Sequence, residues 1–141
     1  MTKEVMITIS GFRITDGEQE AVELTVRGDY YRKNGNHYLL YQETEDGGEK
    51  SRSRIRISPG SMDMKKSGAH LIFEKDRKHV SGYMTPAGEL TVGILTEKLE
   101  MREDEDQLEA DLEYSLEING SHVSDCRIRV SARSLKQQKT V

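Results

Sequence analysis

The segment from Gln107 to Ile118 alternates between apolar and polar side chains without interruption. Every even-numbered residue from Leu108 to Ile118 is apolar or aromatic, and every odd-numbered residue from Gln107 to Glu117 is acidic or polar. Successive side chains of a β-strand point to opposite faces, so this period of two predicts a long strand with one dry and one wet face. Such strands are typical of antiparallel sheets.

The same alternation recurs along the chain, and no segment shows the 3.6-residue period of a helix. Ser51 to Ile57 is one example, in which the odd-numbered residues face inward and Lys50, Arg52, Arg54 and Arg56 face outward. Glycines inside predicted strands (Gly11, Gly28, Gly82, Gly93) stand where a closing sheet bends. We therefore predict an all-β fold, a single antiparallel up-and-down β-barrel of about 8–10 strands over residues 1–134, with a loose tail at 135–141. A two-sheet sandwich is the alternative.

The composition fits a barrel, whose whole outer surface meets water. Charged residues make up 33% of the chain and hydrophobic residues only 34%. The net charge of -4 disfavours nucleic-acid binding. The single cysteine excludes an internal disulfide, and no apolar stretch is long enough to suggest a membrane partner. We expect a cytoplasmic protein.

Asn34-Gly35 and Asn119-Gly120 predict hairpins, because both residues of a type I′ turn need positive φ. A two-residue loop at Asn34-Gly35 places Tyr30 opposite Leu39, and it pairs Tyr31 with Tyr38 on the outer face. Around Asn119-Gly120 the inner rows are even-numbered on both sides. The loop must therefore hold an odd number of residues, or a β-bulge must follow it, so that Arg127 and Arg129 stay outside.

Two irregularities are predicted near residues 80–100. Thr85 to Gly88 favours a three-residue loop that pairs Met84 with Leu90 and Val80 with Ile94, which leaves Tyr83 on the outer face. The change of phase near Leu95 predicts a β-bulge.

Several stretches of the chain resemble the YwiB-like family of small bacterial β-barrel proteins, a domain of unknown function. They are Gly28-Asp-Tyr-Tyr, Tyr38-Leu-Leu-Tyr-Gln-Glu, Tyr83-Met-Thr-Pro-Ala-Gly-Glu-Leu and Leu112-Glu-Tyr-Ser-Leu-Glu-Ile-Asn-Gly. The resemblance lies in their order and spacing from about Val5 to Val130, and the family's arginine-glycine segment reads Lys66-Ser67-Gly68 here. It implies a calycin/lipocalin-like barrel in the bacterial cytosol and no particular activity.

Inward-facing polar residues form the first candidate site. A buried phenol needs a hydrogen-bond partner, and a small barrel either fills its lumen with side chains or holds one small ligand. Either these residues satisfy one another in a filled lumen, or they bind a small amphipathic molecule with an acidic or polar head. The set is Arg13, Tyr30, Tyr41, Ser53 and Tyr114.

The second candidate site is an aromatic and basic outer face. It would serve protein–protein contact, such as a homodimer, or more weakly a single nucleic-acid strand, and the alternative is ordinary solvated barrel surface. Its residues are Tyr31, Tyr38, Arg52, Arg54 and Arg56.

No pattern favours an enzyme or a cofactor. The four histidines lack metal-ligand spacing, Cys126 falls on an inner row as a small inert hydrophobe, and Glu103 to Asp106 lacks the glycine and spacing of a calcium loop. We predict no metal and no cofactor. The most favoured function is a non-catalytic binding module for a small, partly apolar ligand in the barrel lumen.

Overall fold

The computed structural model describes residues 2–44, 48, 50–66 and 68–135. These residues form ten β-strands: β1 (Thr2–Thr15), β2 (Glu18–Lys33), β3 (Asn36–Thr44), β4 (Lys50–Ser58), β5 (Ser61–Lys66), β6 (Ala69–Glu74), β7 (Lys78–Thr85), β8 (Gly88–Glu103), β9 (Gln107–Ile118) and β10 (Ser121–Ser134). The described ranges contain no helix that could cross a membrane. The predicted tail from residue 136 lies outside them.

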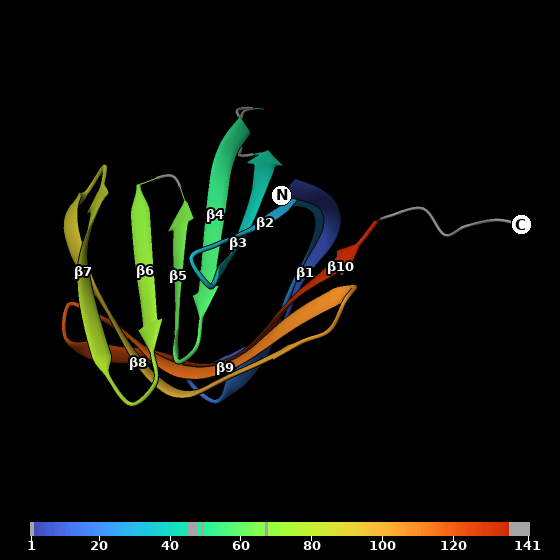
Figure 1. Cartoon of the computed structure of the whole chain (residues 1–141). Helices are drawn as coiled ribbons and strands as arrows, with labels where there is room; N and C mark the ends of the chain where they lie inside the picture. Colours follow the sequence, from blue (N-terminus) through green and yellow to red (C-terminus); the bar gives the residue numbers. More distant parts are fainter. Residues whose placement is uncertain (1, 45–47, 49, 67, 136–141) are drawn as a thin grey trace, which may run out of the picture.

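One antiparallel sheet contains all ten strands, in the order β6-β5-β4-β3-β2-β1-β10-β9-β8-β7 (Figure 1). Apart from β6 and β7, strands that follow each other in the chain pair with each other, and the pairing of β1 with β10 joins the two halves. Among the described strands, β6 and β7 form the two edges of the sheet. The sheet curls into a nearly closed barrel, which confirms the predicted barrel over the sandwich.

One predicted hairpin register and two predicted β-bulges are confirmed. Asn34 and Gly35 have φ values of 52° and 79°, and Tyr30 lies opposite Leu39. A bulge between His122 and Ser124 follows the two-residue loop Asn119-Gly120, so Arg127 lies opposite Glu113 on the outer face. A second bulge lies between Thr96 and Lys98, two residues from the predicted position.

The prediction of a three-residue loop between β7 and β8 is wrong. Thr85 pairs with Gly88 across a two-residue loop, which places Tyr83 opposite Leu90 on the inner face. Val80 and Met84 point outward instead, with 62% and 71% of their surface exposed. The Thr85 hydroxyl accepts a hydrogen bond from the Ala87 N–H and donates one to the Gly88 carbonyl, and these bonds stabilise the short turn.

Inward rows from both halves of the sheet form the core. Buried β-branched and leucine side chains from β1, β3, β4 and β9 meet in its centre, including Ile7, Leu39, Ile55, Ile57 and Leu112. The alternation of β9 is confirmed, since Leu108, Ala110 and Leu112 are buried. The removal of these apolar side chains from water is the main stabilising contribution to the fold.

A gap separates β6 from β7, although these strands follow each other in the chain. The connecting turn is tied to β8, because the Asp76 N–H donates to the Thr96 carbonyl at 2.8 Å and the Thr96 N–H donates to the Arg77 carbonyl at 3.4 Å. Above this point the two strands stand apart at the left of Figure 1.

Candidate functional site

The wall of the barrel opens where β2 parts from β3. Pairing between the two strands covers only Gly28 to Lys33 of β2, while β2 pairs with β1 from Glu18 to Tyr31 and β3 pairs with β4 from His37 to Thr44. A hollow of about 890 Å³ lies there, lined by residues of β1 to β7. Its size is within the usual range for small-molecule sites.

Tyr41 and Ser53 face each other across β3 and β4 at this hollow. Tyr41 is 4% exposed and Ser53 is 2% exposed. The Ser53 hydroxyl donates to Oε1 of Glu43 at 3.4 Å, and the Lys66 ammonium lies 3.3 Å from the same oxygen. Burial raises the pKa of Tyr41 to about 12, and the negative charge of Glu43 adds to the rise.

Two buried polar atoms of the lining residues have no hydrogen-bond partner among the described residues. They are Oη of Tyr41 and Nε of Arg54. Buried polar atoms in proteins are nearly always satisfied, and an unsatisfied one costs about 1–3 kcal/mol. Both atoms are enclosed by neighbouring side chains, and hydrogen bonding with Ser53 and Glu43 contributes to the pKa of Tyr41, so a bound polar group would reach them only after side chains move.

The lining is rich in cations although the whole chain is acidic. Five cationic residues line the hollow against the carboxylates of Glu4 and Asp29: Arg27, Arg52, Arg54, Lys65 and Lys66. Arg54 also contacts Asp63 at 3.4 Å. Among the described residues, no carboxylate oxygen lies within 4.0 Å of the charged nitrogens of Arg27, Arg52 or Lys65, so this hollow favours anions.

A different polar cluster closes the end of the barrel near β9. The Tyr30 hydroxyl lies 2.7 Å from Nδ1 of His37, and Nε2 of His37 lies 3.6 Å from Glu103. Burial lowers the pKa of His37 and raises that of Tyr30. Only about 40 Å³ of space remains beside Tyr30, so these residues fill the barrel end.

The remaining predicted lumen residues lie away from the hollow. Arg13 is half exposed and its Nε donates to Glu20 at 2.6 Å. Tyr114 packs edge-on against Phe73 with ring centroids 4.9 Å apart, and burial raises the pKa of its hydroxyl. Burial also raises the pKa of the neighbouring Cys126 thiol.

The predicted surface set is divided between two places. Tyr31 and Tyr38 stack at 4.7 Å with their rings 6° from parallel, and the Arg54 guanidinium lies 5.9 Å from the Tyr38 ring. Arg56 donates from Nε to Asp63 at 2.8 Å. Arg52 and Arg54 line the hollow, where they join Tyr41 and Ser53.

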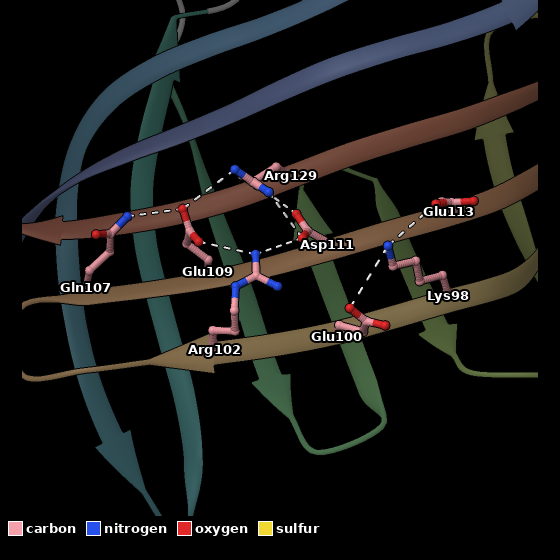
Figure 2. Close-up of polar contacts among 8 residues, drawn as sticks. All are labelled: Lys98, Glu100, Arg102, Gln107, Glu109, Asp111, Glu113 and Arg129. Carbon is pink, nitrogen blue, oxygen red and sulfur yellow. Dashed lines mark hydrogen bonds and ion pairs between the residues drawn. The ribbon is translucent and has the colours of Figure 1, made fainter.

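The outer face of β8, β9 and β10 carries an ion-pair ladder (Figure 2). Asp111 accepts hydrogen bonds from Nε of Arg129 and Nη2 of Arg102, each at 2.7 Å. These bonds lower the pKa of Asp111 to about 2. The acids and bases of the ladder pair with one another, so it stabilises the register of the three strands.

No group of three or more metal-ligating side chains converges within the described ranges. In the acidic turn after β8, Oδ1 of Asp104 accepts the N–H groups of Asp106 and Gln107 at 2.8 and 2.9 Å. That oxygen therefore closes the turn.

Sequence reasoning missed most of the lining of the hollow, including Gly28 and the cations Arg27, Lys65 and Lys66. No local signal marks the three cations, since isolated charges on a strand resemble ordinary surface. Gly28 had a signal, because glycine inside a strand often marks a close approach.

In a comparison with known protein families, residues 7–130 match a domain of unknown function, DUF1934. An uncharacterised β-barrel protein of Bacillus subtilis (strain 168), YwiB, is 29% identical over 109 residues, which cover 73% of this chain and 74% of that protein. The crystal structure of the ywiB protein from Bacillus subtilis has a TM-score of 0.83 at 23% identity, covering 94% of this chain and 92% of that one.

Proposed function

This chain belongs to the DUF1934 family, whose function is unknown, and from its own geometry we propose a non-catalytic binding module for a small, partly apolar anion. The ligand would enter the hollow between β2 and β3. Its head group would face the cations, and its apolar part would lie toward the barrel interior.

The cationic lining of this ligand-sized hollow carries the proposal, since Arg27, Arg52 and Lys65 have no carboxylate partner among the described residues. The Tyr41 hydroxyl lies buried beside Glu43 and Ser53, and its raised pKa of about 12 keeps it protonated. A protonated phenol can donate to a carboxylate or phosphate oxygen, as Arg54 can through Nε. Arg27, Arg52 and Lys65 supply the long-range attraction for an anion.

Native mass spectrometry of the freshly purified protein, followed by a denaturing run, is the first test. Mass that disappears on denaturation identifies the class of the bound molecule. A protein that is free of any ligand is then titrated with decanoate, with decanol as the uncharged control.

Two variant pairs locate the site. Tyr41→Phe is expected to weaken decanoate binding about tenfold, which corresponds to losing one hydrogen bond to a charged group. Tyr114→Phe, away from the hollow, is its matched control. Arg52→Gln should weaken binding and Arg127→Gln on the far outer face should not. Equal affinity for decanoate and decanol, or no binding of either, contradicts the proposal.

The stacked rings of Tyr31 and Tyr38, part of the predicted surface set, support a second candidate function, in protein–protein contact. The parallel tyrosine rings beside the Arg54 guanidinium form a flat aromatic and cationic surface. Tyr31→Ser with Tyr38→Ser should weaken assembly if this face is used, and an unchanged mass in solution argues against it. Single-stranded nucleic acid, a calycin-type relationship and a cytoplasmic location stay predictions from the sequence.

A further inference from the structure

Strand β7 has a partner on one side only. It pairs with β8 from Lys78–Leu95 to Thr85–Gly88, and no other strand of the described chain pairs with it. Every second residue of such an edge strand turns its backbone N–H and C=O away from the partner strand. An edge of this kind is a ready template for another strand.

β6 covers the start of this edge, since Nε2 of His79 lies 2.9 Å from Oε1 of Glu74, but the usual protections of an edge strand are missing from Val80 to Thr85. No Lys, Arg, Asp, Glu or Pro occurs from His79 to Thr85, and the register with β8 has no bulge. Val80 and Met84 are the most exposed large apolar side chains of the described residues. Both lie on the outward face of β7, two residues on either side of Gly82.

No contact among the described residues requires a glycine at position 82. Its φ is not in the left-handed region, and a Cβ there would meet only the flexible end of Glu89, with Oε2 at 3.3 Å. The regular register excludes a bulge as its cause. A glycine inside a strand also allows another backbone to approach closely.

We propose that β7 pairs antiparallel with β7 of a second copy of this chain, about a two-fold axis at Gly82. This register places Val80 opposite Met84 of the second copy and Met84 opposite its Val80. His79 then faces Thr85 and Ser81 faces Tyr83, so no like charges oppose each other. A two-fold interface requires such self-complementarity.

The dimer would also complete one side of the hollow. Gly82 lines it together with Ala69 and His70 of β6, so a strand added to β7 would lie in the β6–β7 gap. The dimer proposal rests on the β7 edge alone and does not depend on ligand binding.

Light scattering after gel filtration tests the proposal on the full chain, over a series from micromolar to millimolar protein. Wild type is expected to be a dimer. Val80→Lys with Met84→Lys places like charges opposite each other twice, which should raise the dissociation constant roughly a hundredfold or more. Leu95→Lys, at an exposed apolar residue of β8 that is not on the edge, should leave the dimer intact. Circular dichroism checks that all variants keep their strands.

A cysteine cross-link tests the register. Gly82→Cys should form a disulfide-linked dimer on mild oxidation, because the two residues face each other at the axis. Met84→Cys should form much less, since its symmetry mate lies several residues away. A monomeric wild type throughout the series overturns the proposal, as does a dimer that survives the lysine pair. Loss of the dimer in Tyr31→Ser with Tyr38→Ser would also overturn it by placing the contact on the outer tyrosines.

Discussion

Tyr30 and His37 form a hydrogen bond of 2.7 Å between Oη and Nδ1 at the filled end of the barrel. The imidazole is 1% exposed, and Glu103 faces its other nitrogen. Since the carboxylate can only accept, we assign the ring proton to Nε2 and the Tyr30 hydroxyl as donor to Nδ1. The neutral imidazole thus joins a phenol to a carboxylate.

The first prediction concerns pH. Burial lowers the pKa of His37 in the folded protein, whereas an unfolded histidine titrates near its ordinary value of about 6.5. Below that value the unfolded chain binds more protons, so the free energy of unfolding falls as the pH drops, by at most about 1.4 kcal/mol per pH unit. Urea unfolding at pH 7.5 and pH 5.5 measures the loss. His37→Gln should reduce it.

The second prediction concerns the ladder of Figure 2. The pKa of Asp111 is lowered to about 2 by its bonds with Arg129 and Arg102, so its stabilising contribution is present above the unfolded pKa near 4 and is lost as the pH falls toward 2. Asp111→Asn should lower the urea midpoint at pH 7 and change it little at pH 2. Glu113→Gln is the control, since its two ion pairs are looser at 3.8 Å. An equal effect of Asp111→Asn at both pH values contradicts the assignment.

The third prediction concerns the bulge after Asn119-Gly120. Deleting Val123 removes the extra residue between His122 and Ser124 and would turn Arg127 and Arg129 into the core. We expect the deletion to prevent folding. Inserting one glycine after Gly120 in the deletion variant makes a three-residue loop and should restore the β-sheet spectrum. A folded deletion variant without the insertion would show that this register does not depend on the bulge.

The fourth prediction concerns Gly28. A Cβ at this position would lie 2.4 Å from the Leu40 carbonyl oxygen and 2.6 Å from Cδ1 of Ile7. Gly28→Ala must therefore push β2 away from β3 and is expected to cost about 1–3 kcal/mol of unfolding free energy. Gly93→Ala should cost less, because its added Cβ meets side-chain ends of Glu117 and Lys78 that can move. Chemical unfolding of both variants makes the comparison.

The register of two hairpins could be predicted because local signals agree with the hydrophobic rows. Asn34-Gly35 demands positive φ, and the even rows around Asn119-Gly120 allow one parity only. The β7–β8 hairpin was mispredicted because Val80 and Met84 suggested an inward row. On an edge strand, packing against the core only weakly forces apolar side chains to face inward. The hydrogen bonds of the Thr85 hydroxyl therefore determine the turn.

The candidate site was predictable only in part. Tyr41 and Ser53 could be placed on inward rows from alternation alone. The hollow itself depends on where β2 leaves β3 and on the gap beside β7, which follow from how the whole sheet curls. That curvature brings Arg52 and Arg54, which were predicted as outer residues, together with the inward-facing Tyr41 and Ser53. No local sequence pattern predicts this curvature.

The position of the barrel's closure has a consequence for folding during synthesis. β1 is joined to β10 from Val5–Ser134 to Ile14–Asp125, so one edge of β1 stays unpaired until nearly the whole described chain has left the ribosome. Contacts so distant in sequence form slowly, and an unpaired edge can aggregate meanwhile. The gap falls between β6 and β7, where a short connection would have made pairing easiest. The nascent chain therefore pairs β1 with β10, the strands most distant in sequence, last. It leaves β6 and β7, which follow each other in the chain, unpaired.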